Sequence, residues 1–250
     1  MFKLGLIGKE LSHSFSKKYF DRKFKNENIY NYYYDLYDLD NLNQLETLIN
    51  QHKIVGLNVT RPYKKKIIQY LDELDDISKK IGSVNTIFIN HKTNQKIGFN
   101  TDAIGFEALL LDLRLNKHIK GLILGSGGVS NTVSYIFKKY QIRHKIVSRK
   151  PNSEMLHYSE LDNVIHKFQL IINTTPLGQY PHINSFPKIP YSLITNKQIC
   201  IDLIYNPKKT ILLQKMESQG AYVINGSKML KKQADEAWWI WNKMIKKYEI

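Results

Sequence analysis

The stretch that decides the fold reads Gly121-Leu122-Ile123-Leu124-Gly125-Ser126-Gly127-Gly128-Val129-Ser130, an apolar run followed by a glycine-rich turn. Behind it, Val133, Ile136 and Phe137 recur at helical spacing, so the turn joins a strand to an amphipathic helix. Glycines in that context let a pyrophosphate approach the helix N-terminus, whose free N–H groups attract anions. The stretch therefore predicts a Rossmann-like unit with these dinucleotide-binding residues: Gly125, Ser126, Gly127, Gly128 and Val129.

The following strand bears on which dinucleotide would bind, and it ends Ile146-Val147-Ser148-Arg149-Lys150. NAD-binding units carry an Asp or Glu near this point, which binds the ribose 2′-hydroxyl. Here a hydroxyl and two cations stand instead; they favour a 2′-phosphate, and Arg149 can also stack on adenine. We therefore expect NADP rather than NAD, bound in part by Ser148, Arg149 and Lys150. The alternative is an ordinary solvated strand end.

Apolar runs alternate with amphipathic segments on both sides of this unit. In the first half we expect strands at 4–8, 30–37, 54–59 and 84–90, and helices at 15–26, 42–51, 63–71 and 75–81. A helix at 101–113 leads into the second half, where further strands are expected at 145–147, 170–173, 199–204 and 222–224. This alternation predicts an α/β protein with a mostly parallel sheet in each half.

The predicted organisation is two domains. Residues 1–102 would form a substrate-binding catalytic domain and residues 103–228 the dinucleotide-binding domain. A last helix at 229–250 carries Trp238, Trp239 and Trp241, which we interpret as packing anchors that return this helix to the first domain.

A second informative stretch is Asn58-Val59-Thr60-Arg61-Pro62-Tyr63-Lys64, where a buried strand ends in polar residues. Pro62 lacks a backbone donor and suits a first helical turn, so the strand should stop there and a helix follow. The carboxyl ends of strands in open α/β sheets are where ligands bind. An amide, a hydroxyl and an amine at that point could hold a polyhydroxylated substrate and move a proton. The alternative is a strand end with a solvated lysine run.

Composition narrows the functional class. The net charge of +15 is spread over many short lysine pairs rather than one stripe, which disfavours nucleic acid as the main partner. A single cysteine, Cys200, excludes a disulfide framework, and the histidines show no metal-ligand spacing. No run approaches about 18 apolar residues, so we expect no membrane span and a cytoplasmic protein.

Several short motifs, in the same order along the chain, resemble those of the shikimate dehydrogenase family. They read His13-Ser14-Phe15-Ser16, Asn58 to Lys64, Gly82-Ser83-Val84-Asn85-Thr86, Gly98-Phe99-Asn100-Thr101-Asp102-Ala103-Ile104-Gly105, Asn173-Thr174-Thr175-Pro176-Leu177-Gly178, Asp202-Leu203-Ile204-Tyr205-Asn206-Pro207, and Gly226-Ser227-Lys228-Met229-Leu230 with Gln233-Ala234. Each motif alone is weak, but together they are highly specific and cover nearly the whole chain.

The resemblance implies an oxidoreductase that interconverts 3-dehydroshikimate and shikimate with NADP, in chorismate and aromatic amino-acid biosynthesis. It implies that Lys64 is the acid/base and that Asp102 assists it. The implied substrate-binding residues are Ser14, Ser16, Thr60, Asn85, Asp102, Tyr205 and Gln233. Thr174, Leu203 and Gly226 would join the cofactor-binding residues already named, and no metal is implied.

The sequence also departs from the family. Glu10 and Lys17 stand near positions where the family usually has proline, and Gln179 stands where methionine is common. Local alternatives exist as well: Asp102 could be a helix N-cap, the serines could be loop caps, and His13 is more readily structural than a site base.

Rival functions remain at this point. One is a quinate/shikimate dehydrogenase that uses NAD, and another is a non-catalytic binding protein of the same fold. A basic nucleic-acid binder is a third, and the oligomeric state, monomer or homodimer, is open. The absence of an acidic residue at 148–150 disfavours the first rival, and the presence of Lys64 and Asp102 disfavours the others.

Overall fold

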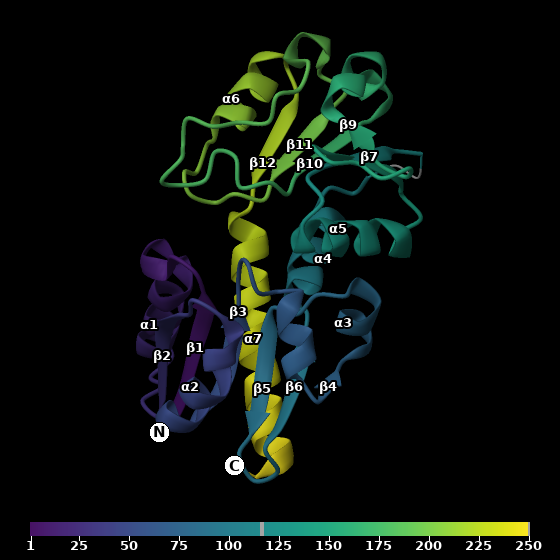
Figure 1. Ribbon diagram of the computed structural model, residues 1–250. Coiled ribbons are helices and arrows are strands. Elements are labelled where there is room, and N and C mark those ends of the chain that lie inside the picture. Colours follow the sequence, from purple (N-terminus) through teal and green to yellow (C-terminus); the bar gives the residue numbers. More distant parts are fainter. Residues whose placement is uncertain (116–117, 250) are drawn as a thin grey trace. The chain divides into compact units, whose positions relative to one another are not determined.

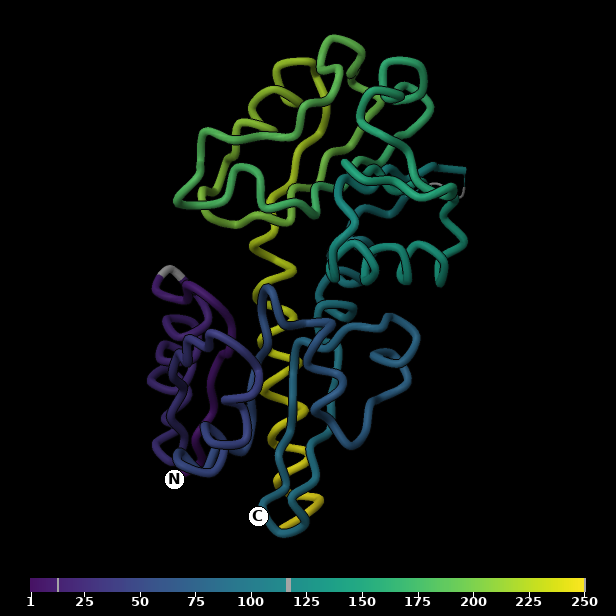
Figure 2. Tube along the Cα trace, viewed as in Figure 1, coloured from purple at the N-terminus to yellow at the C-terminus, as the bar shows by residue number. Residues whose placement is uncertain are grey.

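The computed structural model describes residues 1–115 and 118–249, with only the backbone of His13, and the chain divides into two compact units. The first unit holds Met1–Thr101 and the chain from Ala234 onward, and the second holds Asp102–Gln233. Figures 1 and 2 trace the chain through these units. No described helix combines the length and apolar character that crossing a membrane requires.

The sheet of the first unit has six strands in the order β2-β1-β3-β5-β6-β4. Their bounds are Phe2–Gly8 (β1), Tyr32–Asp38 (β2), Ile54–Val59 (β3), Glu73–Leu74 (β4), Thr86–Asn90 (β5) and Gln95–Phe99 (β6). Strand β1 pairs parallel with β2 and β3, as the alternating pattern predicts. Strands β5 and β6 form an antiparallel hairpin, and β5 also pairs antiparallel with β3. This hairpin places the start of β5 beside the end of β3.

The helices of the first unit are α1 (Phe15–Asn26), α2 (Leu45–His52), α3 (Asp76–Ile81) and the short 3-10 helices η1 (Leu11–His13), η2 (Leu42–Gln44) and η3 (Lys66–Tyr70). Two apolar clusters fill the unit. One contains Phe20 of α1, Tyr34 of β2 and Trp241 of α7 (Ser227–Tyr248). The other contains Ile49 of α2 and Ile67 of η3. Because strand side chains alternate between faces, the two clusters cover opposite faces of the sheet.

The helix expected at 63–71 is wrong in type, because the structure has turns followed by η3. The carbonyl of Lys64 accepts a hydrogen bond from Val84 N at 2.8 Å, so it is engaged by the chain leading into β5. Ile68 N then bonds the carbonyl of Lys65, which is the spacing of a 3-10 helix. A contact with a distant segment therefore overrides the local helical preference.

The C-terminal part of α7 lies along the sheet of the first unit (Figure 2). Trp241 is fully buried, and its Nε1 donates to the carbonyl of Ile87 at 2.9 Å. Gly56 leaves room for this ring, since a Cβ there would lie 2.5 Å from Nε1. The prediction of three packing anchors is wrong for Trp239, which is 54% exposed beneath the Lys243 ammonium.

The sheet of the second unit is parallel throughout, in the order β12-β11-β10-β7-β8-β9. Its strands are Lys120–Leu124 (β7), Arg143–Ser148 (β8), Leu156–His157 (β9), Leu170–Asn173 (β10), Ile199–Asp202 (β11) and Tyr222–Asn225 (β12). Its helices are α4 (Thr101–Asp112), α5 (Gly128–Lys139), α6 (Ile211–Ser218), η4 (Tyr158–Asn163), η5 (Ile165–Lys167) and η6 (Tyr191–Leu193). The strand order reverses between β7 and β10, the switch point at which doubly wound sheets bind ligands.

Candidate functional site

Asn58 anchors a hydrogen-bonded group at the carboxyl end of β3. Its Oδ1 accepts from the Tyr34 hydroxyl at 2.9 Å, and its Nδ2 donates to Thr86 Oγ1 at 3.1 Å. Asn58 is only 6% exposed, so these bonds satisfy an amide that would otherwise be costly to bury. The side chain therefore joins β2, β3 and β5 where a substrate site is predicted.

Tyr34 connects this group to the serine motif at the start of α1. Its hydroxyl also hydrogen-bonds the Ser16 side chain, and burial raises its pKa, so the phenol stays protonated. Ser14 is the N-cap of α1, and its Oγ accepts from Ser16 N at 3.2 Å. The predicted residues Ser14 and Ser16 are thus tied to the end of β3 by a buried tyrosine that the sequence analysis did not single out.

Asn85 forms a paired contact with Thr101 at the start of α4. Asn85 Oδ1 accepts from Thr101 N at 2.7 Å, and its Nδ2 donates to Thr101 Oγ1 at 2.9 Å. Thr86 Oγ1 lies 3.2 Å from Thr101 Oγ1. Asp102, the next residue, is 6% exposed in the first turn of α4, where a helix dipole favours a carboxylate. The sequence analysis did not name Thr86 and Thr101 as site residues, although each follows an asparagine in a family-like motif, and these Asn-Thr pairs could have indicated them.

Thr60 and Lys64 lie in the turn that follows β3. Thr60 N donates to Ile7 O at 2.9 Å, which ties the turn to β1, while Lys64 O is held by Val84 N. Lys64 is half-buried, whereas Lys65 and Lys66 are exposed. The backbone therefore distinguishes Lys64 from the two lysines that follow it.

The glycine turn after β7 lies at the switch point of the second sheet. Gly125 has φ +105°, and a Cβ there would lie 2.9 Å from Thr174 Oγ1 and 3.0 Å from Thr175 Cγ2 at the end of β10. Gly127 is the N-cap of α5, and a Cβ there would meet nothing within 4 Å. The turn thus needs glycine at Gly125 for its backbone, and at Gly127 it leaves an open approach to the first turn of α5, where Gly128 and Val129 lie.

Hydroxyl and cationic groups surround the end of β8. Ser126 Oγ and Ser148 Oγ lie 3.1 Å apart, and Ser148 Oγ also accepts from Lys150 N at 3.2 Å. The side chains of Arg149 and Lys150 are exposed. Burial raises the pKa of Tyr158, and the positive charge of Arg149 opposes that shift, so the guanidinium lies close enough to influence the phenol. These groups are donors, as a phosphate ligand requires.

A buried network of hydrogen bonds around the Asp202 carboxylate holds the ends of β10 and β11. Asp202 accepts from Asn173 Nδ2 at 2.9 Å, from Ile204 N at 3.1 Å and from Thr210 Oγ1 at 2.6 Å. Burial raises the pKa of Asp202 to about 6, although these hydrogen bonds oppose the shift. The network fixes the strand ends that carry the remaining predicted cofactor residues.

Those remaining residues lie directly after the strands. Thr174 Oγ1 donates to Leu124 O at 2.7 Å, and Leu203 N donates to Asn173 O at 3.1 Å. Gly226 abuts Leu203 so closely that a Cβ would lie 2.1 Å from the Leu203 carbonyl oxygen. Tyr205 is half-buried after β11, and Gln233 Nε2 donates to Leu230 O at 3.0 Å within α7.

The predicted site residues therefore form two groups. Ser14, Ser16, Thr60, Lys64 and Asn85 belong to the first unit, while Asp102, Tyr205, Gln233 and the cofactor residues belong to the second. Each group is arranged within its own unit, and pairing of Lys64 with Asp102 stays a prediction. The side chain of His13 lies outside the described residues.

The departures from the family pattern have local structural outcomes. Glu10 adopts a left-handed conformation, φ 57°, before η1. Lys17 donates to Tyr34 O at 2.8 Å, so a cation now joins α1 to β2 where the family usually has proline. Gln179 is half-buried and its backbone N bonds Pro176 O at 3.0 Å.

Comparison with known proteins identifies the family. Residues 6–87 match the family model described as the shikimate dehydrogenase substrate binding domain. A protein named shikimate dehydrogenase (NADP(+)) from Methanococcus vannielii is 36% identical over 95% of this chain and 90% of its own length. The chain belongs to the shikimate dehydrogenase family. A second relative of that name, from Clostridium botulinum, is 34% identical, with 96% of each chain covered.

Solved structures of the family agree. Shikimate dehydrogenase 1 from Peptoclostridium difficile has 33% identity and a TM-score of 0.86, covering 97% of this chain and 92% of that one. A shikimate dehydrogenase solved in complex with NADP+ has 32% identity and a TM-score of 0.83, covering 97% of this chain and 90% of that one. The predicted two-part α/β fold and the family resemblance are confirmed.

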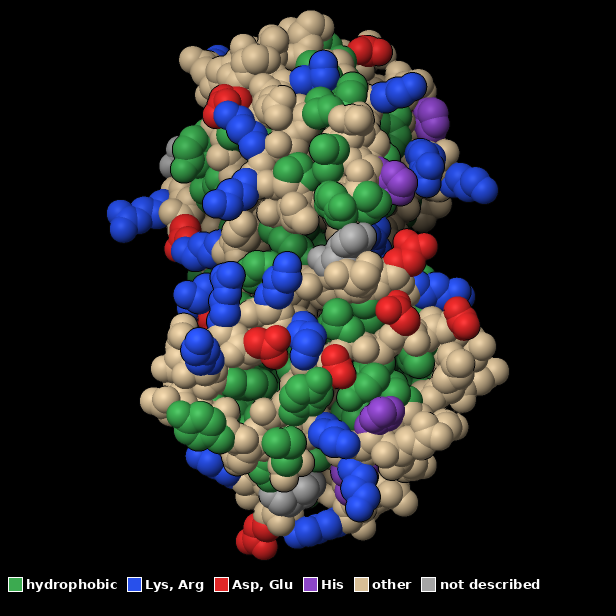
Figure 3. Space-filling model, turned by 90° about the vertical axis from the view of Figure 1, so that its left-hand side faces the viewer, with side chains coloured by type: hydrophobic (Ala, Val, Ile, Leu, Met, Phe, Trp, Pro, Cys, Tyr) green, Lys and Arg blue, Asp and Glu red, His purple; other side chains and the backbone are tan. Residues whose placement is uncertain are grey.

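The basic charge has no single focus on the visible surface. On the face shown in Figure 3, Lys and Arg side chains are interspersed with acidic, apolar and other polar ones.

No group of three or more His, Cys, Asp or Glu side chains suited to a metal occurs in the described part of the chain.

Proposed function

We propose that this protein is an NADP-dependent shikimate dehydrogenase, which reversibly reduces 3-dehydroshikimate to shikimate in chorismate and aromatic amino-acid biosynthesis. The observation that carries the proposal is the family match along nearly the whole chain, to relatives that bear this name. The residues to which the proposal gives catalytic and binding roles are divided between the two units, and among them Thr60 and Lys64 follow β3 and Tyr205 follows β11.

The first unit would bind the substrate through neutral polar groups. Ser14, Ser16, Thr60 and Asn85 offer hydroxyls and an amide, which suit a ligand with several hydroxyl groups and one carboxylate. Ser16 and Asn85 are held by bonds to Tyr34 and Thr101, so their positions are fixed before a ligand arrives. Such preorganisation lowers the entropy cost of binding. Asp102, Tyr205 and Gln233 would complete the substrate contacts.

The second unit fits a dinucleotide with a 2′-phosphate. The open space at Gly127 suits a pyrophosphate, as do the first N–H groups of α5, which have no carbonyl partner within the helix, and the first turn contains no acidic residue. Ser148, Arg149 and Lys150 would hold the 2′-phosphate, since the chain offers donors and no carboxylate at 148–150. When bound, NADPH supplies the hydride that the reduction requires.

Lys64 would provide the proton. In the reductive direction its ammonium donates a proton to the oxygen of the ketone, and in the oxidative direction its amine accepts the hydroxyl proton. Asp102 would orient the amine and stabilise its charged form. Lys64 suits this role better than its neighbours, because it is half-buried and its backbone is tied to Val84.

The proposal is tested by following absorbance at 340 nm with shikimate and NADP, then with NAD, then with quinate. Reduction of NADP by shikimate is the expected result. Faster turnover with NAD or with quinate would favour a quinate/shikimate dehydrogenase. A folded protein that reduces neither cofactor with either substrate would rule out the enzyme and leave a non-catalytic binding protein.

A further inference from the structure

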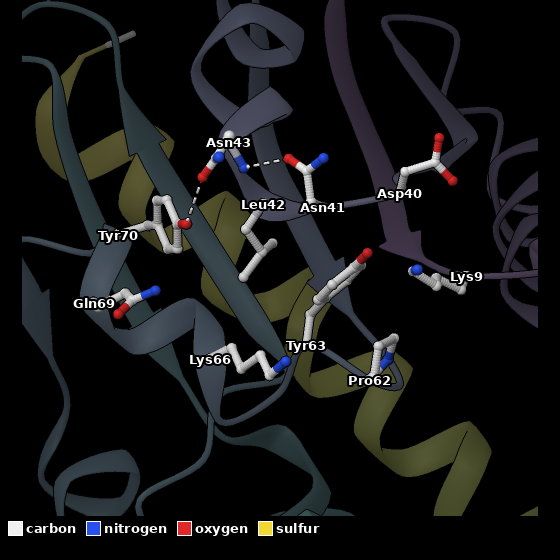
Figure 4. Close-up of a pocket in the computed structure, with 10 residues that line it drawn as sticks. All are labelled: Lys9, Asp40, Asn41, Leu42, Asn43, Pro62, Tyr63, Lys66, Gln69 and Tyr70. Carbon is white, nitrogen blue, oxygen red and sulfur yellow. Dashed lines mark hydrogen bonds between the residues drawn. The ribbon is translucent and has the colours of Figure 1, made fainter.

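A small pocket in the first unit is separate from the residues assigned to the substrate. It is open to solvent and has a volume of about 260 Å³ between the segments that follow β1, β2 and β3, with η3 along one side (Figure 4). Lys9, Asn41, Pro62 and Lys66 are among the residues that line it. All of its lining belongs to the first unit.

The pocket lies on the opposite face of the sheet from Tyr34. Its lining residues Leu42 and Tyr63 belong to the apolar cluster beneath α2 and η3. Tyr34, which joins Ser16 to Asn58, belongs to the cluster beneath α1 and α7. A ligand in this pocket would therefore not occupy the position expected for the substrate.

Two lysines give the pocket a positive charge. Lys9 and Lys66 are exposed, and the ammonium group of neither has an ion-pair or hydrogen-bond partner among the described residues. Figure 4 shows their ammonium groups directed toward Tyr63 from opposite sides. Asp40 also lines the pocket, but it pairs with neither lysine in the described chain, and its carboxylate points away from both.

The amide oxygens of Asn41 and Asn43 at the pocket already accept hydrogen bonds, whereas the Asp40 carboxylate does not accept from either lysine. The Tyr63 hydroxyl donates to Leu39 O at 2.5 Å, and the Tyr70 hydroxyl donates to Asn43 Oδ1 at 3.0 Å. Asn41 Oδ1 accepts from Asn43 N at 3.0 Å, which leaves the Asn41 NH2 group as a donor. The donors left around the pocket are two ammonium ions and an amide NH2, and a ligand that brings acceptor oxygens and negative charge would replace water as their partner.

We propose that this pocket is a binding site for a small oxyanion with two negative charges, a phosphate monoester or a dicarboxylate, bridged between Lys9 and Lys66. Charge-assisted hydrogen bonds to two ammonium groups favour such a ligand over a neutral one. The volume is below the roughly 300–1,000 Å³ typical of pockets for larger ligands, so the anion is small. Pro62 and Tyr63 belong to the turn that also carries Lys64, so an anion bound in the pocket would contact that turn.

The experiment is a titration of the full chain followed by amide NMR. Glycerol 3-phosphate and succinate are the two probes, and sodium chloride at matched ionic strength is the control. We expect saturable shifts at Lys9, Asn41, Tyr63 and Lys66 with at least one probe, and the probe that binds identifies the ligand class. Lys9→Gln or Lys66→Gln should weaken binding about tenfold, because each removes one charged hydrogen bond.

The matched control is Lys80→Gln, which removes an exposed lysine on α3 outside the pocket and should bind as the unmodified protein does. Equal weakening by all three variants would show general charge attraction and overturn the proposal. It would also be overturned if neither probe gave saturable shifts, or if the shifts matched those of chloride or were confined to Ser148 and Arg149. These readouts do not depend on dehydrogenase activity, so the outcome is separate from that of the enzyme assay.

Discussion

The strand end of the first unit and the glycine turn of the second unit are built in different ways. Around Asn58 and Asn85, buried side chains satisfy one another through specific hydrogen bonds. Around Gly125 and Gly127, the backbone forms the site, and the charged side chains nearby are exposed. The first arrangement suits a small rigid ligand with many hydroxyl groups, and the second suits phosphates, which are recognised by charge and by N–H groups.

The largest expected effect concerns Lys64. Lys64→Ala should lower kcat about 10²- to 10⁴-fold while the affinity for shikimate changes little, because the lost group acts mainly on proton transfer. Steady-state kinetics together with shikimate binding by calorimetry check this. Lys65→Ala is the matched control and should keep its activity. An unchanged kcat in Lys64→Ala would remove Lys64 from the proposed role.

The next effect concerns Asp202, which is a buried carboxyl group, unlike the exposed charged side chains near the glycine turn of the same unit. Its pKa is about 6 in the folded protein, against an ordinary value of 3.8, so between these pH values the folded state binds the extra proton. The Asp202 contribution to stability should therefore fall as pH rises from about 4 to 6, by about 3 kcal/mol at most.

Urea unfolding between about pH 4 and pH 7.5 measures this contribution as the difference between the unmodified protein and Asp202→Asn. Taking this difference cancels the pH dependence of stability that other carboxyl groups cause in both proteins. The exposed Asp162→Asn variant serves as control. A difference that stays constant with pH would show that Asp202 titrates near its ordinary value.

Two glycine variants distinguish a glycine that the backbone conformation requires from a glycine that leaves room for a ligand. Gly125→Ala should lower the stability by about 1–3 kcal/mol, because its positive φ and close neighbours oppose a side chain. Gly127→Ala should leave the melting temperature nearly unchanged and weaken NADP about tenfold, since its Cβ would project into the open space. Thermal unfolding and calorimetry distinguish the two. Normal NADP affinity in Gly127→Ala would show that the dinucleotide does not approach there.

Arg149 should decide between the two dinucleotides. Arg149→Ala should weaken NADP about tenfold through loss of a charge-assisted contact, and it should change NAD affinity much less. Titrations of both cofactors, with the exposed Lys145→Ala as control, measure this difference. Equal weakening of NADP and NAD would place Arg149 against the adenine rather than the 2′-phosphate.

The smallest effect tests the side-chain network of the first unit. Thr86→Val keeps the shape but removes the oxygen that accepts from Asn58 Nδ2, so we expect a loss of about 1 kcal/mol of stability. NADP affinity should be unchanged, because Thr86 belongs to the other unit. Thr93→Val, in the exposed turn between β5 and β6, is the control. If both variants were equally stable, the network would not contribute measurably.

Much of the fold could be predicted from the sequence, because its signals are local. Hydrophobic periodicity gave α1 at Phe15–Asn26, β3 at Ile54–Val59 and β10 at Leu170–Asn173 as the structure has them. Strand β6 was missed, since Gln95–Phe99 is short and its alternation weak. The helix expected at 63–71 failed because Val84 engages the Lys64 carbonyl, and no local pattern reveals that contact.

By itself, the sequence determined most of the element types, the glycine turn with its cations and the set of polar residues near strand ends, because propensity, periodicity and turn chemistry act over a few residues. Only the tertiary structure decided that Tyr34 joins Ser16 to Asn58, that Asn85 pairs with Thr101, and that Lys9 and Lys66 share a pocket. Such pairings join segments far apart in the chain, so they depend on strand order and on which face of the sheet each side chain occupies.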